Sequence, residues 1–204
     1  MNKFLASLLA SACLTLGAVE AQLPGVTLNG RVERVTSGCD PAAGYRITCS
    51  DVQLKSSTVD LSQWVNRTVT LTGTPEVRVG CITVDVATIE NAAARTTLLA
   101  LGGYRIGTSV IITTTAPAGA VVAYVFGAEN AFVPLGQFGT YLMDPLTSVY
   151  WTFDLSIGLA VRNLPIPRDP ALVGHRALFQ VVYGSVTPTF ELGILNPNCF
   201  TITQ

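Results

Sequence analysis

Hydrophobic and polar residues alternate along most of the chain, and glycine or proline interrupts the alternation about every ten residues, as in short strands joined by turns. In the N-terminal part this pattern predicts strands at 26–35, 45–55, 68–73 and 81–90, a turn at 40–44 and a short helical turn at 60–65. Gly30 interrupts the first of these strands and predicts a bend or bulge there. The expected fold class is all-β.

The composition changes after residue 95. Residues 96–204 contain nine charged side chains against fourteen in residues 22–95, and they contain thirteen of the fifteen aromatic residues that follow residue 21. Strands are expected at 109–115, 120–126, 140–143, 149–155, 172–183, 190–195 and 199–203. Short strands at such regular spacing predict a β-sandwich. Within 149–155, Trp151, Phe153 and Leu155 share one side and Thr152 and Asp154 the other, so we expect this strand to be half-buried.

Residues 1–21 have the pattern of a secretory signal peptide. A short positive segment ending at Lys3 precedes an apolar run over 4–16, and Val19-Glu20-Ala21 offers a cleavage site before Gln22. Cys13 follows small residues, as in a lipoprotein cleavage site, but the residues around it fit that motif poorly. We therefore expect a secreted or cell-envelope protein with a cleaved leader, and lipid anchoring at Cys13 as the less favoured alternative.

The mature chain is nearly neutral. Eleven basic and twelve acidic residues follow residue 21, and neither sign is gathered into a block. A basic block is what a nucleic-acid-binding surface needs, so nucleic acid is not an expected partner. No later segment has the roughly twenty consecutive apolar residues that a transmembrane helix requires. The expected organisation is a leader at 1–21, a small barrel at 22–94 and a sandwich at 95–204.

Two stretches resemble modules of exported bacterial proteins. The run DLSQWVNRTVTLTG at 60–73, followed by CITVDV at 81–86, is similar to OB-like modules of such proteins, and the resemblance covers about seventy residues. The run LPIPRDPALVG at 164–174, with Gln180 six residues later, resembles a C-terminal β-sandwich module of unknown function. The resemblance implies an OB-like barrel followed by a sandwich, and it implies no activity. The prolines at 165, 167 and 170 predict an extended segment that crosses between sheets or protects an edge.

Four cysteines follow the leader, namely Cys39, Cys49, Cys81 and Cys199. In an oxidising compartment an even number predicts two disulfides, and three connectivities are open. Only Cys199 lies in the C-terminal half, so complete pairing within one chain requires it to bridge to the N-terminal half; a free Cys199 or an intermolecular bond are the alternatives. One histidine and no C-x-x-C pair argue against zinc.

Candidate catalytic residues are few. His175 has no serine, cysteine or acidic partner in a known motif, so a strand-edge histidine without a role is expected. Asp144 and Asp154 could be imagined as a sugar-cleaving pair, but a turn residue and a solvated strand residue are the expected roles. The aromatic side chains of Tyr141 and Tyr150 are the tentative surface for glycan binding.

These observations predict a non-enzymatic secreted or cell-envelope protein that acts by binding or assembly and has no cofactor. Low charge and many aromatic residues in the C-terminal half favour a subunit packed against an envelope partner or against itself. The alternative is a soluble extracellular protein that binds a glycan or another small ligand.

Overall fold

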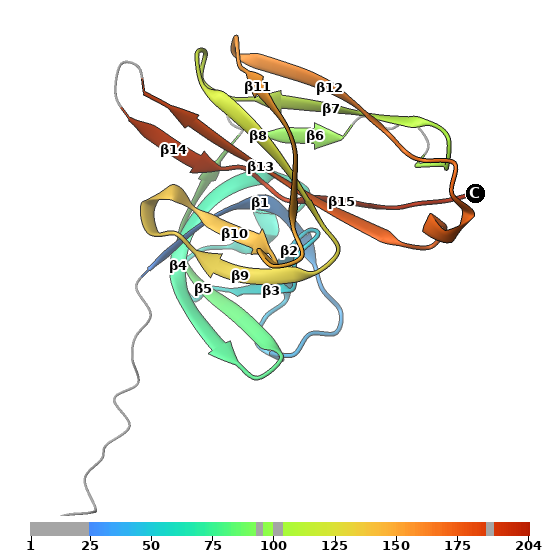
Figure 1. Ribbon diagram of the computed structural model, residues 1–204. Coiled ribbons are helices and arrows are strands. Elements are labelled where there is room, and N and C mark those ends of the chain that lie inside the picture. The colour runs from blue at the N-terminus through green and yellow to red at the C-terminus, as the bar shows by residue number, and fades with distance from the viewer. Residues whose placement is uncertain (1–24, 93–95, 100–103, 187–189) are drawn as a thin grey trace, which may run out of the picture.

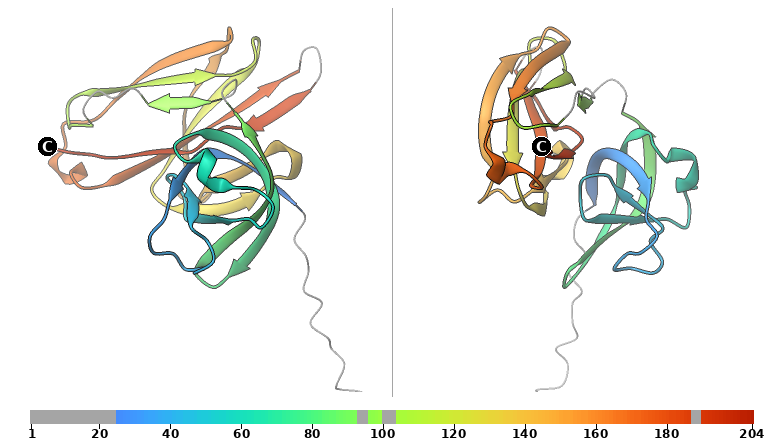
Figure 2. Two further views of the ribbon diagram at one scale, coloured as in Figure 1. Left: turned by 180° about the vertical axis from the view of Figure 1, so that it is seen from behind. Right: turned by 90° about the vertical axis from the view of Figure 1, so that its right-hand side faces the viewer.

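The computed structural model describes residues 25–92, 96–99, 104–186 and 190–204. The described part consists of β-strands and three short 3-10 helices, so the fold is all-β as the alternation predicts. A barrel built from the N-terminal strands lies against a sandwich built from the C-terminal strands (Figures 1 and 2). The predicted leader at 1–21, Cys13 and part of the boundary expected at 94–95 lie outside the described residues.

Five strands form the closed barrel. They are β1 (Val26–Arg34), β2 (Tyr45–Ile47), β3 (Val52–Lys55), β4 (Thr68–Arg78) and β5 (Cys81–Asn91). The order around the barrel is β1-β2-β3-β5-β4, with β4 pairing back to β1. Only the β3–β5 pair is parallel, and the 3-10 helix η1 (Leu61–Trp64) connects β3 to β4. This order and this helical connector are those of the OB barrel that the sequence resembles.

Gly30 lies just before the point where β1 changes partners. Residues Val26–Arg31 pair with β4, and residues from Val32 onward pair with β2. A Cβ atom at Gly30 would lie 2.3 Å from the side chain of Ile47, which shows how closely β1 passes over β2. The predicted bend in the first strand is therefore confirmed, because only glycine permits this close approach.

The segment 45–55, predicted as one strand, is two. A turn at Thr48–Asp51 separates β2 from β3, and Ser50 donates its backbone N–H and its hydroxyl to the carbonyl oxygen of Ile47. Cys49 occupies a left-handed conformation in this turn, with φ of 65°. Ser50 and Asp51 are common turn residues, and the prediction of one continuous strand passed over them.

The C-terminal strands form two packed sheets and a separate hairpin. One sheet has the order β11-β8-β13-β14, with β15 also pairing to β13, and the other has the order β12-β7-β6. Their strands are β6 (Thr97–Leu99), β7 (Ser109–Thr115), β8 (Val121–Gly127), β11 (Val149–Leu155), β12 (Leu159–Pro165), β13 (Arg176–Ser185), β14 (Glu191–Ile194) and β15 (Asn198–Thr201). Strands β9 (Asn130–Pro134) and β10 (Thr140–Met143) form the separate hairpin, joined by the 3-10 helix η2 (Gly136–Phe138).

The core of the sandwich lies between these two sheets. Ile112 of β7 packs against Val122 and Tyr124 of β8 and against Phe179 and Val181 of β13. All five side chains are buried. Strands β6, β9 and β12 were not predicted, and the proline-rich segment contributes Pro165 to β12, which is an edge strand of its sheet.

The β9–β10 hairpin joins the sandwich to the barrel. Leu142 of β10 is fully buried in the barrel core, among residues of β1, β3, β4 and β5. On its other side the hairpin is bound to β13 by Gln180, whose side-chain oxygen accepts the N–H of Leu142 and whose side-chain nitrogen donates to the carbonyl oxygens of Thr140 and Leu195. The core of the barrel therefore extends into the β9–β10 hairpin, while the two sheets of the sandwich have a core of their own.

Two disulfides cross-link the chain. Cys39 is bonded to Cys81 within the barrel, and Cys49 is bonded to Cys199 of β15. The second bond joins the barrel to the sandwich, as the distribution of cysteines predicts. It closes a loop of 150 residues, which confirms the internal bridge over a free or intermolecular Cys199.

Candidate functional site

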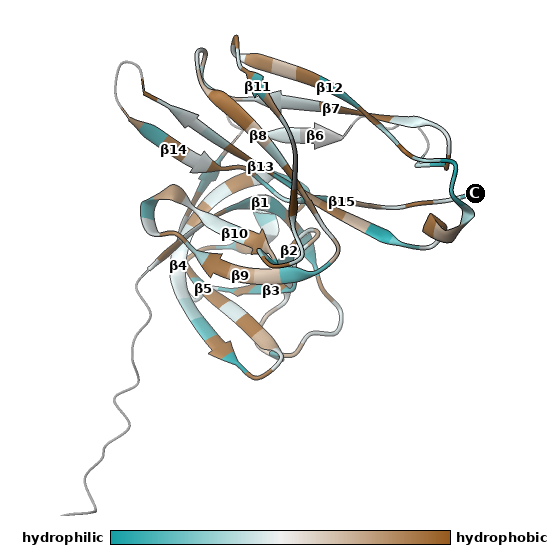
Figure 3. Cartoon of the chain, viewed as in Figure 1, coloured by the Kyte–Doolittle hydropathy of each residue, from teal (hydrophilic) through white to brown (hydrophobic). Residues whose placement is uncertain are grey.

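Strands β11 and β12 follow each other through the turn at 156–158, but they are edge strands of the two opposite sheets and do not pair with each other. We call this strand–turn–strand segment the edge hairpin, and it turns its hydrophobic side chains outward. Phe153, Leu155 and Ile157 are 59%, 65% and 85% exposed, and Leu159 and Val161 are 49% and 56% exposed. We call these five residues the hairpin surface. In Figure 3 the hydrophobic colour is visible on β8 and along β12 at this end of the sandwich. Monomeric proteins expose single hydrophobic side chains routinely, but five within residues 153–161 are typical of an interaction surface. Because Asp154 and Arg162 meet between the sheets, Phe153 and Leu155 lie on the outer face of one sheet, Leu159 and Val161 lie on the outer face of the other, and Ile157 lies in the turn that joins them.

Polar side chains of the same hairpin face inward. Asp154 accepts hydrogen bonds of 2.6 and 2.7 Å from the guanidinium group of Arg162. Ser156, only 1% exposed, donates to the carbonyl oxygen of Ala116 and accepts the N–H of Gly158. The sequence correctly predicts which residues of 152–155 share a side, but the hydrophobic side that includes Phe153 and Leu155 faces solvent. The inward polar contacts are the physical reason for this inversion, because turning the hairpin over would break them.

The ion pair lies beside a buried phenol. The carboxylate of Asp154 raises the pKa of Arg162, through its hydrogen bond first and its charge second. Burial raises the pKa of the Tyr124 phenol, so this group stays neutral where an ordinary tyrosine ionises. Of these two effects, only the attraction between Asp154 and Arg162 stabilises the inward arrangement of polar groups at neutral pH, because the phenol of Tyr124 is neutral there in the unfolded chain as well.

The hairpin surface extends onto neighbouring strands and onto free strand edges. Val121 of β8, opposite Leu155, is 50% exposed, and Ile111 of β7, opposite Asn163, is 45% exposed. Strands β11 and β12 are each at the edge of their sheet, and no described strand pairs with the outer side of either. Such an edge offers backbone hydrogen-bonding groups to an incoming strand.

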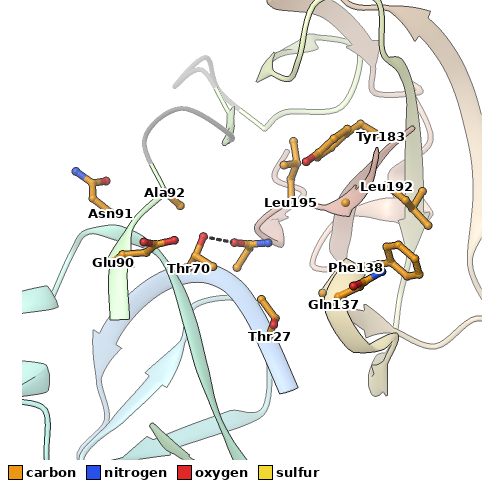
Figure 4. Close-up of a pocket in the computed structure, with 13 residues that line it drawn as sticks. Thr27, Thr70, Glu90, Asn91, Ala92, Gln137, Phe138, Tyr183, Leu192 and Leu195 are labelled. Carbon is orange, nitrogen blue, oxygen red and sulfur yellow. Dashed lines mark hydrogen bonds between the residues drawn. The ribbon is translucent and has the colours of Figure 1, made fainter. Parts of the chain in front are cut away.

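A cleft of about 430 Å³ lies between the barrel and the sandwich. The barrel contributes side chains of β1, β4 and β5, and the sandwich contributes side chains of η2, β13 and β14 (Figure 4). The lining residues are Thr27, Asn29, Thr70, Glu90, Asn91, Ala92, Gln137, Phe138, Gly139, Tyr183, Leu192, Gly193 and Leu195. Its volume is in the range of roughly 300–1,000 Å³ that small-molecule sites occupy.

Hydrogen bonds across the seam hold the two walls of the cleft together. Asn29 donates its side-chain N–H to the carbonyl oxygen of Ile194, at 2.7 Å, and accepts the hydroxyl of Thr70, at 2.6 Å. The hydroxyl of Thr140 donates to the carbonyl oxygen of Thr27, at 2.7 Å. Together with the Cys49–Cys199 bond, these contacts fix the width of the cleft.

The face of the barrel that OB folds commonly use for ligands is cross-linked here. That face lies between the β1–β2 and β4–β5 loops, and the Cys39–Cys81 bond joins the β1–β2 loop to the first residue of β5. Lys55 forms ion pairs with Glu76 at 2.8 Å and with Asp40 at 3.7 Å on the same side. The positive charge of Lys55 is thus neutralised, and the ion pairs occupy the face on which a phosphate backbone would lie.

The remaining predicted residues do not form one site. Tyr141 lies half-buried on β10 against the cluster around the Cys49–Cys199 bond. Tyr150 lies on β11, where its backbone pairs with Val125, and its side chain is outside the described ones. A glycan surface shared by these two tyrosines stays a prediction.

Asp144 lies in a turn, and His175 lies at the surface just before β13. The carboxylate of Asp144 accepts the N–H of Leu146, which makes it a turn residue as expected. His175 is exposed, and its backbone bonds to Leu172 and Ile202. Among the described residues no cluster of histidine, cysteine, aspartate or glutamate could hold a metal ion. A search of the same residues finds no helix of sufficient length and hydrophobicity to cross a membrane.

Sequence reasoning missed most of the hairpin surface because it missed β12. The apolar run at 159–161 was available as a signal for that strand, but it could not show that Arg162 lies opposite Ile112 and faces inward. The cleft had no such signal, because its lining comes from six separate elements. No model of a known protein family and no curated protein sequence matches this chain.

Proposed function

We propose that this chain is a non-enzymatic secreted or cell-envelope protein that works by protein–protein contact through its hairpin surface. The observation that carries the proposal is the inverted edge hairpin, which exposes Phe153, Leu155, Ile157, Leu159 and Val161, buries Ser156 and turns the partly buried Asp154 inward to Arg162. Binding of a partner that covers these side chains is favoured by about 25 cal/mol for each Å² of apolar surface removed from water.

Several further features support the proposal. The leader pattern at 1–21 favours export, and the two disulfides are the kind of cross-link that oxidising compartments permit. The one charged residue between positions 153 and 161 is Asp154, and it points inward. A partner that covers the hairpin surface therefore does not have to desolvate a charge. The free edges of β11 and β12 would let the partner add backbone hydrogen bonds to the apolar contact.

The double substitution Phe153→Ser and Leu155→Ser tests the proposal. The wild-type protein is expected to associate, either with itself in sedimentation velocity or with a protein that co-purifies from its native envelope fraction. The double variant should be monomeric and free of that protein, because the outward face of β11 then lacks its two largest apolar side chains.

A matched control is Val77→Ser with Val79→Ser, which removes two exposed apolar side chains from the β4–β5 hairpin of the barrel. This control should associate as the wild type does. A wild-type protein that stays monomeric and unaccompanied, or a Phe153/Leu155 variant that associates normally, contradicts the proposal.

A further inference from the structure

We infer that the cleft between barrel and sandwich binds an uncharged saccharide. This inference goes beyond the contact function of the hairpin surface, because the cleft lies at the seam and shares no residue with that surface. It concerns the wall formed by Glu90 and Asn91 on the barrel side and the wall formed by Gln137, Phe138 and Tyr183 on the sandwich side (Figure 4).

The charge of the cleft selects against anions. Among its thirteen described lining residues, Glu90 is the single charged one, and none is basic. A phosphate or carboxylate ligand would meet a like charge with no compensating cation. Its other polar groups are amides and hydroxyls, which suits a neutral ligand.

The hydrogen-bonding groups of the cleft match sugar hydroxyls. The side chains of Glu90 and Gln137 are exposed and have no hydrogen-bond partner within the described part of the chain. A carboxylate accepts two hydrogen bonds, and a primary amide both donates and accepts. A sugar hydroxyl also donates and accepts, so a diol can bind Glu90 while a second hydroxyl group or an acetamido group binds Gln137.

Apolar groups complete the site. The ring of Phe138 is half-buried, makes an edge contact with Phe190 at 6.5 Å between centroids, and lines the cleft together with Leu192. The C–H faces of a pyranose ring can pack on such groups. The opposite wall supplies mainly polar contacts, which is the one-sided arrangement that an amphipathic sugar requires.

The cleft is also preorganised. The bonds Asn29–Ile194 and Thr140–Thr27 and the disulfide Cys49–Cys199 hold its walls in place. A ligand therefore loses little free energy to ordering the protein, and a site with few contacts can still bind at millimolar to sub-millimolar concentration.

The test is a titration of the 15N-labelled mature protein, with both disulfides formed, by maltose, cellobiose and N,N′-diacetylchitobiose. At least one of these neutral disaccharides is expected to move the side-chain amide signal of Gln137. Glucose and glucuronate form a matched pair, and the anionic sugar should bind more weakly because of Glu90.

Glu90→Ala and Gln137→Ala should each weaken binding about five- to ten-fold, the worth of one or two hydrogen bonds. Glu129→Ala, an exposed acid outside the cleft, should leave binding unchanged. If none of the three disaccharides moves the Gln137 signal, or if both cleft variants bind as the wild type does, the inference is overturned. Because the hairpin surface is separate, either result leaves the association test to stand on its own.

Discussion

Asp154 and Arg162 form a two-point ion pair between the sheets of the sandwich, with N···O distances of 2.6 and 2.7 Å. Asp154 is on the edge strand β11 and Arg162 on the edge strand β12, so the pair links the two sheets at one side. Because neighbouring residues of a strand point to opposite sides, the inward Asp154 requires Phe153 and Leu155 to point outward.

Removing this ion pair should loosen the hairpin. Arg162→Ala leaves the carboxylate of Asp154 without its partner, and an unpaired polar group at this position favours opening of β11 towards water. Hydrogen exchange of the β11 and β12 amides should become faster. Arg34→Ala, which removes an exposed arginine from the barrel, is the control and should not change their exchange. Unchanged exchange in Arg162→Ala would show that the ion pair does not set the orientation of the hairpin.

Leu142→Ala should destabilise the barrel although Leu142 belongs to the sandwich side of the chain. The side chain is fully buried in the barrel core, so its truncation should lower the free energy of unfolding by about 2–5 kcal/mol. The measurement is urea denaturation followed by Trp64 fluorescence in a Trp151→Phe background, since Trp64 packs on the barrel core. The exposed Leu146, four residues away, is the control, and its alanine variant should be close to neutral. Equal free energies of unfolding for the two variants would mean that the β9–β10 hairpin does not share the core of the barrel.

The two disulfides should differ in their contribution to stability. In the chain-entropy treatment, a bond that closes 150 residues contributes about 5 kcal/mol and one that closes 42 residues about 4 kcal/mol. Replacing Cys49 and Cys199 by alanine should therefore lower the free energy of unfolding at least as much as replacing Cys39 and Cys81. Denaturation of the two double variants measures this, and a nearly neutral Cys49/Cys199 variant would contradict the role of that bond in joining barrel and sandwich.

Asp40 should make stability depend on pH in the acid range. Its carboxylate accepts the N–H of Ala42 and lies near Lys55, and these contacts, in that order of size, lower its pKa. A lowered folded-state pKa means that the ionised form stabilises the fold above the unfolded-state pKa of about 4, and that this stabilisation is lost as the pH falls through the folded-state pKa.

The comparison with Asp40→Asn isolates this effect, because asparagine keeps an acceptor for Ala42 but cannot ionise. The difference in unfolding free energy between wild type and variant should be constant near neutral pH and should shrink in acid. Urea denaturation across the pH range measures it. A difference that stays constant down to the lowest pH would exclude Asp40 as the titrating group.

The barrel was largely predictable from the sequence. The hydrophobic residues that alternate along its strands are the buried ones. Asp60 caps the helical turn, because its carboxylate accepts the N–H of Ser62, and Gly30 permits the close approach of β1 to Ile47. The turn at Cys49 was missed because the alternation was followed through it, although Ser50 and Asp51 are common turn residues. Counting cysteines showed that complete pairing within one chain requires Cys199 to reach the N-terminal half, and the three-dimensional structure identifies Cys49 as its partner.

The candidate sites were less predictable than the fold. A period of two shows which residues share a side of a strand, and it does not show which side faces inward. For Phe153 and Leu155 that choice depends on Arg162, which is supplied by a strand the prediction lacked. The cleft depends on how β14 and η2 approach β1, and only contacts such as Asn29–Ile194 determine this approach.

Site-specific photo-cross-linking from position 153 tests most directly whether the hairpin surface is the contact surface. With p-benzoylphenylalanine in place of Phe153, irradiation of the protein in its native envelope should give one defined cross-linked product, either with a partner protein or with a second copy. The same group in place of Val79, which is fully exposed on the barrel, should give none. No product from position 153, or equal products from both positions, would contradict the account.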